Sequence, residues 1–261
     1  MDIPSLYSVT GKSVLITGGV GGIGRMLSEG FAAAGARVFI TARKAEALEQ
    51  TLSALRAAGA QAEGCVADLS SPAGLTSVID WMKASVEQLD VLINNAGQTW
   101  GAPLQDFPAK AWTPVMAVNV QAPFMLVQGL LPLLEAAASD ESPARIINIG
   151  SIYAATTEVM TAYSYTASKA AIHQLTRVMA HDLAPRRILC NAIAPGLFPS
   201  KMTGFALKND VAREALLKTI PLGRVGTAED IAGLAMFLAS RAGSYITGAI
   251  IPLDGGILIA H

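Results

Sequence analysis

Short apolar runs alternate along the chain with longer segments in which apolar residues recur every three or four positions. The runs 13–17, 37–41 and 145–149 are apolar almost throughout and too short for helices, which is typical of strands buried on both faces. Segments such as 45–58 and 165–181 have the periodicity of helices. Strands that alternate with helices predict an α/β fold, with a parallel sheet covered on both faces and right-handed connections.

The same pattern predicts the rest of the fold. The other expected strands are 62–67, 91–93, 188–193 and 249–253, and the other expected helices are 25–34, 72–86, 111–134 and 228–238. We expect the segment from 197 to about 219 to be mobile. Because no linker, repeat or low-complexity stretch divides the chain, we expect residues 1–261 to form a single domain.

Composition narrows the classes of function. Charged residues make up 15% of the chain and the net charge is −1, without a basic patch, which argues against nucleic acid. The first residues lack a signal sequence and two cysteines make no disulfide framework, so we expect a reduced, cytoplasmic setting. The uncharged run 111–134 contains three prolines, an asparagine and two glutamines, and we interpret it as a buried helix, not a membrane span.

A glycine-rich turn follows the first expected strand, with five glycines between residues 18 and 24. Glycines let the backbone approach a pyrophosphate, and the helix that follows offers free N–H groups and the positive end of its dipole. A merely flexible turn would also be rich in glycine, but the strand before it and the helix after it favour a dinucleotide site.

The end of the second strand, Thr41-Ala42-Arg43-Lys44, contains no acidic residue. An acid there would bind the ribose 2′-hydroxyl of NAD, whereas an arginine accommodates the 2′-phosphate of NADP. The sequence therefore favours NADP(H), with NAD(H) possible, because Arg43 and Lys44 are equally compatible with a solvated start of a helix.

Tyr165 and Lys169 are four residues apart in an expected helix, so they share one face. A phenol has a pKa of about 10, and a nearby positive charge favours its ionised form, so Lys169 is a candidate for tuning Tyr165 as a proton donor and acceptor. Taken alone, the pair also fits a solvated helix. Polar and glycine residues at the strand ends are expected at the same rim of the sheet, where ligands of such sheets bind.

These motifs, in this order, resemble those of the short-chain dehydrogenases/reductases, single-domain classical type, from about residue 10 to 256. They are Thr-Gly-x-x-x-Gly-x-Gly at 17–24, Asp68-Leu69, Asn94-Asn95-Ala96-Gly97, Asn119, Ser151, Tyr165-x-x-x-Lys169 and Pro195-Gly196. The resemblance implies a Rossmann-type doubly wound sheet of about seven strands. It also implies a mobile substrate lid at about 197–219, and a homotetramer (or homodimer) in which helices near 111–134 and 165–181 pack between subunits.

The resemblance further implies hydride transfer between a nicotinamide and a carbonyl carbon. Ser151 and Tyr165 would hydrogen-bond the substrate oxygen and Tyr165 would protonate it, while Lys169 would hold the nicotinamide ribose and lower the pKa of Tyr165. Asn119 would place a water that links Lys169 to solvent. The residues expected at the cofactor are Gly18, Gly22, Ile23, Gly24, Arg43, Asp68, Leu69, Asn95, Ala96, Gly97, Tyr165, Lys169, Pro195 and Gly196.

Within the family, segments 95–101, 193–200 and 252–256 are similar to those of β-ketoacyl reductases, particularly the rhamnolipid-associated branch. We expect an NADP(H)-preferring reductase of a ketone or 3-oxoacyl compound. The alternatives are a secondary-alcohol or hydroxysteroid dehydrogenase working oxidatively, and a non-catalytic nucleotide-sensing protein.

Two segments differ from the pattern of these relatives. Gly21 stands where many NADP-using relatives have arginine. Segment 135–143 has three acids and no Lys or Arg, which makes docking to acyl carrier protein doubtful.

Apolar and aromatic residues near the motifs are candidates for the substrate wall. They are Trp100, Ile152, Tyr153, Met160, Tyr163, Phe198, Met202 and Phe205. They suit an apolar carbonyl compound, although the same residue types also pack in cores and subunit interfaces. Tyr163 does not replace Tyr165 as the acid because position 167 is alanine. His173 and His181 have no nearby acids or cysteines, so we expect packing or surface roles and no metal site.

Overall fold

Seven parallel strands form one sheet in the computed structural model, which describes residues 2–156, 161–200 and 210–259. The strands are β1 (Ser13–Thr17), β2 (Arg37–Ala42), β3 (Ala62–Val66), β4 (Val91–Asn94), β5 (Ala144–Ile149), β6 (Ile188–Pro195) and β7 (Ile250–Leu253). Their order is β3-β2-β1-β4-β5-β6-β7, and every neighbouring pair is parallel. The prediction of a doubly wound α/β fold is therefore confirmed.

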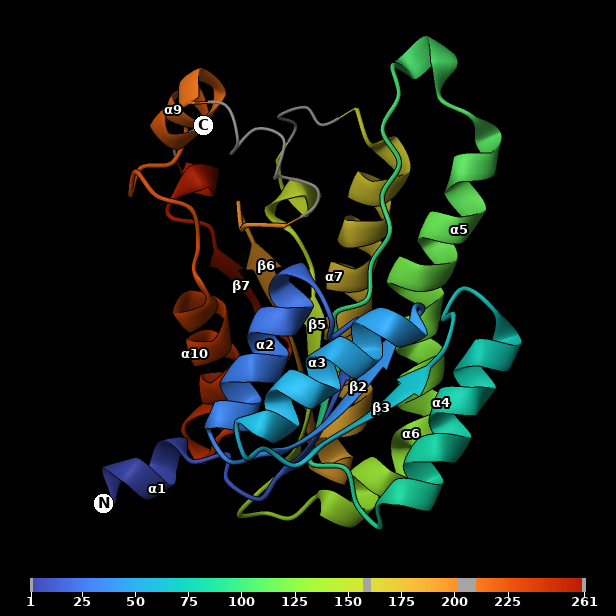
Figure 1. The fold of residues 1–261 in the computed structure, drawn as a ribbon, viewed down its shortest axis with the longest axis vertical. Helices are drawn as coiled ribbons and strands as arrows, with labels where there is room; N and C mark the ends of the chain where they lie inside the picture. The colour runs from blue at the N-terminus through green and yellow to red at the C-terminus, as the bar shows by residue number, and fades with distance from the viewer. Residues whose placement is uncertain (1, 157–160, 201–209, 260–261) are drawn as a thin grey trace.

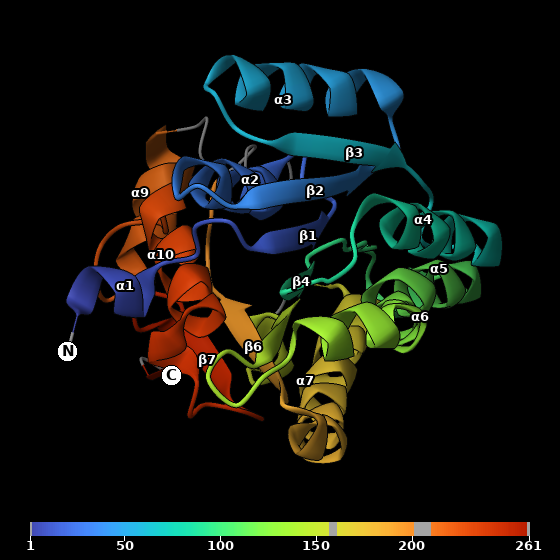
Figure 2. The ribbon, with the colours of Figure 1, turned by 90° about the horizontal axis from the view of Figure 1, so that it is seen from below.

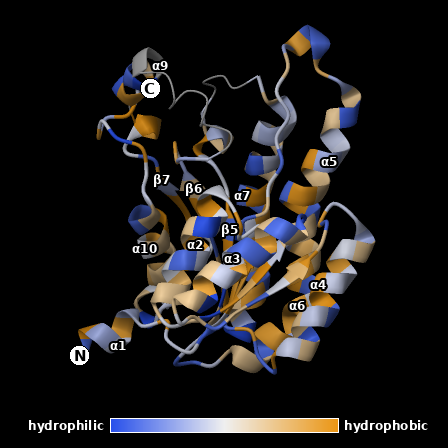
Figure 3. Ribbon diagram, viewed as in Figure 1, coloured by the Kyte–Doolittle hydropathy of each residue, from blue (hydrophilic) through white to orange (hydrophobic). Residues whose placement is uncertain are grey.

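Helices cover both faces of the sheet (Figures 1 and 2). The helices α2 (Gly22–Ala33), α3 (Ala45–Ala57) and α10 (Ala228–Ala239) share one apolar core, and α4 (Pro72–Ser85), α6 (Ala122–Ala137) and α7 (Tyr163–Leu183) share the other. Successive residues of β1 alternate between them: Val14 and Ile16 pack in the first core and Leu15 in the second. This is why the strands are apolar at consecutive positions, as Figure 3 shows for the centre of the molecule.

The strand order places the expected nucleotide site at a topological switch point. β1 pairs with β2 on one side and with β4 on the other. The strand order therefore runs from β1 to β3 in one direction and from β4 to β7 in the other. Ligands of open α/β sheets bind beyond the carboxyl ends of the strands at such a point. The turn after β1 and the turn after β4 therefore meet where a dinucleotide is expected.

The helical boundaries differ from the sequence-based expectation in three places. The expected helix 111–134 consists of α5 (Trp112–Met116), a π-helical turn (Ala117–Gln121) and α6. The short helix α1 (Ile3–Tyr7) was not predicted. Helix α9 (Asp210–Lys218) lies within the segment expected to be mobile, and its apolar Leu217 packs against distant residues, a contact without a local sequence signal. Residues 201–209 of that segment lie outside the described part of the chain.

Of the described helices, one run, Ala109–Ala137, is long and apolar enough to cross a membrane by length and composition. Half of its most apolar window is buried inside the protein. Leu126, Leu130 and Leu134 pack in the second core with α4 and α7. Packing within the chain thus accounts for the buried half of this run, while Trp112 and Phe124 on it are 42% and 43% exposed.

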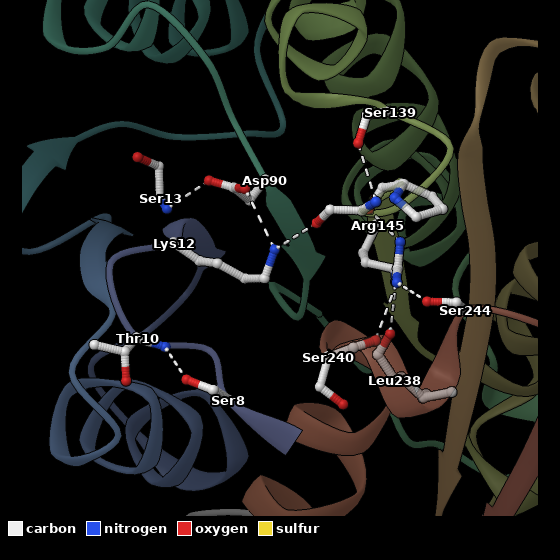
Figure 4. A network of polar contacts seen from close by, with 12 residues as sticks. Ser8, Thr10, Lys12, Ser13, Asp90, Ser139, Arg145, Leu238, Ser240 and Ser244 are labelled. Atoms are coloured by element: carbon white, nitrogen blue, oxygen red, sulfur yellow. Dashed lines mark hydrogen bonds and ion pairs between the residues drawn. The ribbon is translucent and has the colours of Figure 1, made fainter. Parts of the chain in front are cut away.

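Polar contacts join the elements at the N-terminal ends of the strands, on the side of the sheet away from the expected nucleotide site (Figure 4). Asp90 accepts hydrogen bonds from the Ser13 amide at 2.9 Å and from Lys12 at 3.4 Å. Arg145, at the start of β5, is 2% exposed and donates to Leu238 O, Ser240 O and Ser244 Oγ near the end of α10. Burial lowers the pKa of Arg145 to about 10, which leaves it charged. These contacts fix the end of α10 against the start of β5.

Candidate active site

The glycine turn between β1 and α2 is held rigidly from the end of β4. Asn95 Nδ2 donates to Thr17 O at 2.8 Å and to Gly18 O at 3.2 Å, while Thr17 Oγ1 accepts from the Asn95 and Ala96 amides at 3.0 and 2.9 Å. Gly18 has a φ of +65°, and a Cβ on Gly24 would collide with Gly18 O. Only glycine fits both positions, so the backbone is shaped in advance for a pyrophosphate.

The N-terminus of α2 carries no side-chain cap. Its N-cap is Gly21, in an extended conformation, and this residue supplies no side-chain hydrogen bond to the first turn. The first N–H groups of the helix therefore remain available for phosphate oxygens. Ser200 lies over this turn, because a Cβ on Gly22 would be 3.4 Å from Ser200 Cβ. Ser200 was not predicted as a site residue, because its one signal in the sequence is its position shortly after Pro195-Gly196.

Arg43 and Asp68 follow the adjacent strands β2 and β3, where the adenosine ribose is expected. Hydrogen bonds from the amide and hydroxyl of Ser70, and then the charge of Arg43, hold the pKa of Asp68 below its usual value. Arg43 is exposed and makes no hydrogen bond or ion pair within the described residues. Its exposed guanidinium is a candidate to bind a 2′-phosphate.

Four polar residues gather beyond the ends of β4 and β5. Tyr165 and Lys169 lie on α7, Ser151 follows β5, and Asn119 lies in the π-helical turn. Lys169 Nζ is 5.5 Å from the centroid of the Tyr165 ring and donates to Ile149 O at 2.7 Å. A side-chain hydrogen bond joins Ser151 to Tyr165. The structure thus brings together the tyrosine, lysine and serine that the sequence predicted as catalytic.

The pKa of Tyr165 is raised, whereas the sequence led us to expect that Lys169 lowers it. Burial raises the pKa of Tyr165, the hydrogen bond from Ser151 opposes this in part, and Tyr153 adds to the rise. Lys169 is 5% exposed, and burial lowers its own pKa to about 8. The Tyr165 phenol is therefore protonated at neutral pH, the state required to donate a proton to a carbonyl oxygen.

Asn119 links the segment after β4 to α7. Its Oδ1 accepts from the Gln98 amide at 2.8 Å, and its Nδ2 donates to Gln98 O and to Ser168 Oγ, both at 2.9 Å. Ser168 Oγ donates in turn to Tyr165 O at 2.7 Å. Both amide hydrogens of Asn119 are used, so a water placed by this residue would bind an oxygen of Asn119, and that role stays a prediction. Gln98 and Ser168 were missed by the sequence analysis.

His173 lies one helical turn beyond Lys169 and is 7% exposed. A Cβ on Gly150 would collide with His173 Nε2, so the imidazole occupies the side-chain space of the residue that precedes Ser151. Burial, followed by the charges of Lys169 and Arg177, lowers the pKa of His173 to about 4. His173 is a neutral packing residue and His181 is exposed, as expected. The described residues contain no group of three or more metal-type ligands.

The expected substrate wall divides into separate parts. Ile152 and Tyr153 pack beside Ser151 in a small apolar cluster, whereas Trp100 and Tyr163 are 40% and 37% exposed. Phe198 lies in the first core, where its ring occupies the side-chain space of Gly226. Met160, Met202 and Phe205 lie outside the described residues.

This arrangement defines a class of protein. A pre-shaped glycine turn at the switch point, an exposed arginine at the expected ribose position and a Tyr-Lys-Ser group beyond β5 together suit hydride transfer with a nicotinamide dinucleotide. The residues fit the cofactor, because the turn at Gly18 and Gly24 has room for a close backbone approach and for no side chain.

Comparison with known proteins identifies the family. A family model described as Enoyl-(Acyl carrier protein) reductase matches residues 18–258. The chain belongs to this family of short-chain dehydrogenases/reductases and is an NAD(P)-dependent oxidoreductase.

Two curated relatives and two solved structures illustrate the range of the family. The chain is 47% identical to the rhamnolipids biosynthesis 3-oxoacyl-[acyl-carrier-protein] reductase of Pseudomonas aeruginosa, over 96% of this chain and 97% of that protein. It is 35% identical to gluconate 5-dehydrogenase of Gluconobacter oxydans, over the full length of both. The Pseudomonas aeruginosa RhlG/NADP active-site complex has a TM-score of 0.94 at 46% identity, covering 97% and 99% of the two chains. The gluconate 5-dehydrogenase of Burkholderia cenocepacia, in complex with NADP and tartrate, has a TM-score of 0.90 at 32% identity and full coverage of both chains.

Proposed function

We propose that this protein is an NADP(H)-preferring carbonyl reductase that converts 3-oxoacyl-type compounds to 3-hydroxyacyl products. The observation that carries this proposal is the apolar cluster around Ile152, the residue directly after Ser151. A carbonyl compound held by Ser151 and Tyr165 extends its substituents into apolar surroundings there, which suits an alkyl chain. Similarity to a 3-oxoacyl reductase at 47% identity supports the same substrate class.

The residues have distinct parts in the proposed reaction. Ser151 and Tyr165 hydrogen-bond the carbonyl oxygen, and Tyr165 gives it a proton. Lys169 holds the ribose of the cofactor, and its Nζ lies 5.5 Å from the centroid of the Tyr165 ring. Asn119 and Ser168 fix the helical turn that carries both side chains. NADPH bound at the glycine turn supplies the hydride.

Replacing Arg43 by alanine is expected to weaken NADPH binding about 10- to 100-fold, because it removes charge-assisted hydrogen bonds to the 2′-phosphate. NADH affinity stays within about threefold, since NADH lacks that phosphate. Fluorescence titration of both cofactors measures the effect. Arg241→Ala is the matched control, because Arg241 is exposed beyond the end of α10. A wild-type protein that binds NADH as tightly as NADPH would contradict this role of Arg43.

An oxidative secondary-alcohol dehydrogenase is the second candidate. Relatives named gluconate 5-dehydrogenase and galactitol 2-dehydrogenase, each 35% identical, favour it. A polyol or sugar acid requires polar partners along its length, whereas Ile152 packs in a cluster of apolar residues. Kinetics in both directions, with NADP(H) and NAD(H), separates the two functions.

A carrier protein is not part of this proposal. The surface after α6 carries Glu135, Asp140 and Glu141. Arg186 and Arg187, the neighbouring cations, already form ion pairs with Glu135 and Asp140. An acidic carrier would meet no excess of positive charge there. The proposal therefore specifies the acyl group and leaves the thiol that carries it open.

We further propose a cytoplasmic homotetramer. Trp112, Phe124 and Val178 on α5, α6 and α7 are 42%, 43% and 54% exposed and form one candidate interface. The edge strand β7 is partly exposed along its length and offers a second. A tetramer with two-fold symmetry requires two such self-complementary faces. A monomeric mass in light scattering would contradict it. Both cysteines are unpaired, which suits a reducing compartment.

A further inference from the structure

A small apolar cluster lies next to the proposed catalytic serine. Its buried members are Ile152, Ile220 and Ile257, which are 1%, 3% and 6% exposed. Packed against them are Tyr153, Leu197, Leu217, Val225 and Leu258. We call these eight residues the Ile257 cluster. They come from the turn after β5, the segment after β6, helix α9 with the loop after it, and the turn after β7.

The Ile257 cluster lies beyond the C-terminal ends of the strands, on the side where the substrate is expected. The glycine turn and Arg43 would hold the cofactor beyond β1 and β2, and Ser151 follows β5, which is separated from β1 by β4. Beyond the same carboxyl edge, β6 and β7 lead into Leu197 and Ile257. A substituent that extends from the carbonyl away from the cofactor therefore runs along the Ile257 cluster.

The turn that carries Ile257 is held by Asp254, the residue directly after β7. Asp254 Oδ1 accepts from the Gly256 amide at 2.9 Å, and Asp254 Oδ2 accepts from the Leu258 amide at 2.8 Å. Gly255 has a φ of +66°, and a Cβ on it would be 2.7 Å from Ile220 Cγ2. The Leu222 amide donates to Gly255 O at 3.0 Å. These contacts fix the 3₁₀ turn Ile257–Ile259 so that the side chain of Ile257 points into the cluster while Ile259 is 88% exposed.

Space borders the Ile257 cluster on one side. A pocket of about 80 Å³ lies between Leu197, Leu222 and the Asp254-Gly255 turn, and the ion-paired Arg224 and Asp230 also line it. Leu197 belongs to both the pocket and the cluster. The cluster therefore borders this space at Leu197.

Resting on the proposed reduction of 3-oxoacyl compounds, we propose that Ile257 is a specificity-determining residue. Its side chain, fixed by the Asp254 turn, closes the acyl site beside Ile152 and limits the length of the acyl chain. Shortening Ile257 opens room for further methylene groups, each of which gains free energy when it leaves water.

The test compares Ile257→Ala with Ile259→Ala, the same substitution two residues further along the same turn, where the side chain is exposed. The substrates are pantetheine thioesters of 3-oxobutanoate, 3-oxooctanoate and 3-oxododecanoate. We expect Ile257→Ala to raise the ratio of kcat/KM for the dodecanoyl over the butanoyl substrate about 10-fold or more. Ile259→Ala leaves that ratio within about twofold. Circular dichroism and the unfolding midpoint check that each variant folds.

Ile257→Val serves if the alanine variant does not fold, with an expected rise in the ratio of about twofold to threefold. An unchanged ratio in a folded Ile257 variant, or an equal loss for all three substrates, overturns the inference and leaves the cluster a packing element. A wild-type protein that reduces none of the three thioesters contradicts the proposed function itself, and this inference falls with it.

Discussion

Replacing Tyr165 by phenylalanine is expected to lower kcat about 10³-fold while NADPH affinity changes by less than about threefold. The substitution keeps the ring beneath Lys169 and removes only the hydroxyl that protonates the substrate oxygen, and positioned general acids contribute about 10²- to 10⁴-fold. NADPH oxidation followed by absorbance, with a separate binding titration, measures the two effects. Tyr245→Phe is the control, because Tyr245 is fully exposed.

The outcome also decides between an enzyme and a nucleotide-sensing protein. Unchanged turnover in Tyr165→Phe would falsify the assignment of Tyr165 as the acid and revive the non-catalytic alternative. The hydrogen bond from Ser151 and the buried Lys169 argue against that alternative, because a binding protein has no use for a titratable group held in place in this way.

Replacing Lys169 by methionine is expected to reduce kcat/KM at least about 10²-fold and yet to stabilise the fold at pH 7. Burial lowers the pKa of Lys169 from 10.5 to about 8, a penalty of about 3 kcal/mol on its charged form. Loss of the hydrogen bond to Ile149 O offsets part of the gain, so we expect a net increase of about 1–2 kcal/mol in the free energy of unfolding.

The stability difference between wild type and Lys169→Met is expected to depend on pH. Between about pH 8 and 10.5 the unfolded chain binds more protons at Lys169 than the folded chain does, so wild-type stability rises with pH through this window. The free-energy penalty for burying charged Lys169 is fully present below pH 8 and decreases toward pH 10.5. The gain in stability of Lys169→Met over wild type therefore becomes smaller as pH rises through this window. Urea unfolding at pH 7 and pH 9.5 measures it, with the exposed Lys83→Met as control. A Lys169→Met protein whose stability relative to wild type does not change with pH would contradict the predicted burial penalty.

The strands and the order of the motifs could be predicted because their causes are local. Strands buried on both faces must be apolar at consecutive positions, as Val14, Leu15 and Ile16 are. Tyr165 and Lys169 face the same way because four residues make about one helical turn. The glycine turn is needed wherever a backbone must approach a phosphate closely.

The remaining features depend on contacts between distant parts of the chain. The direction of the Tyr165 pKa shift follows from burial, which the spacing to Lys169 does not encode. Ile152 and Ile257 belong to one cluster because β5 and β7, which are far apart in the sequence, end on the same side of the sheet. Helix α9 was missed for the same reason, since Leu217 packs against these residues. Phe198 has the residue type of a substrate wall, yet it fills the core above Gly226.

The most direct measurement of the proposed reaction follows deuterium from NADPH labelled at C4, at each of its two positions in turn, into 3-oxooctanoyl pantetheine. The proton comes from Tyr165 and the hydride from NADPH, so we expect deuterium at C3 of the 3-hydroxyoctanoyl product from one of the two labelled cofactors. We also expect no reduction of the corresponding 2-enoyl thioester. Absence of the label at C3, or reduction of the enoyl compound in place of the 3-oxo compound, would contradict the proposed function.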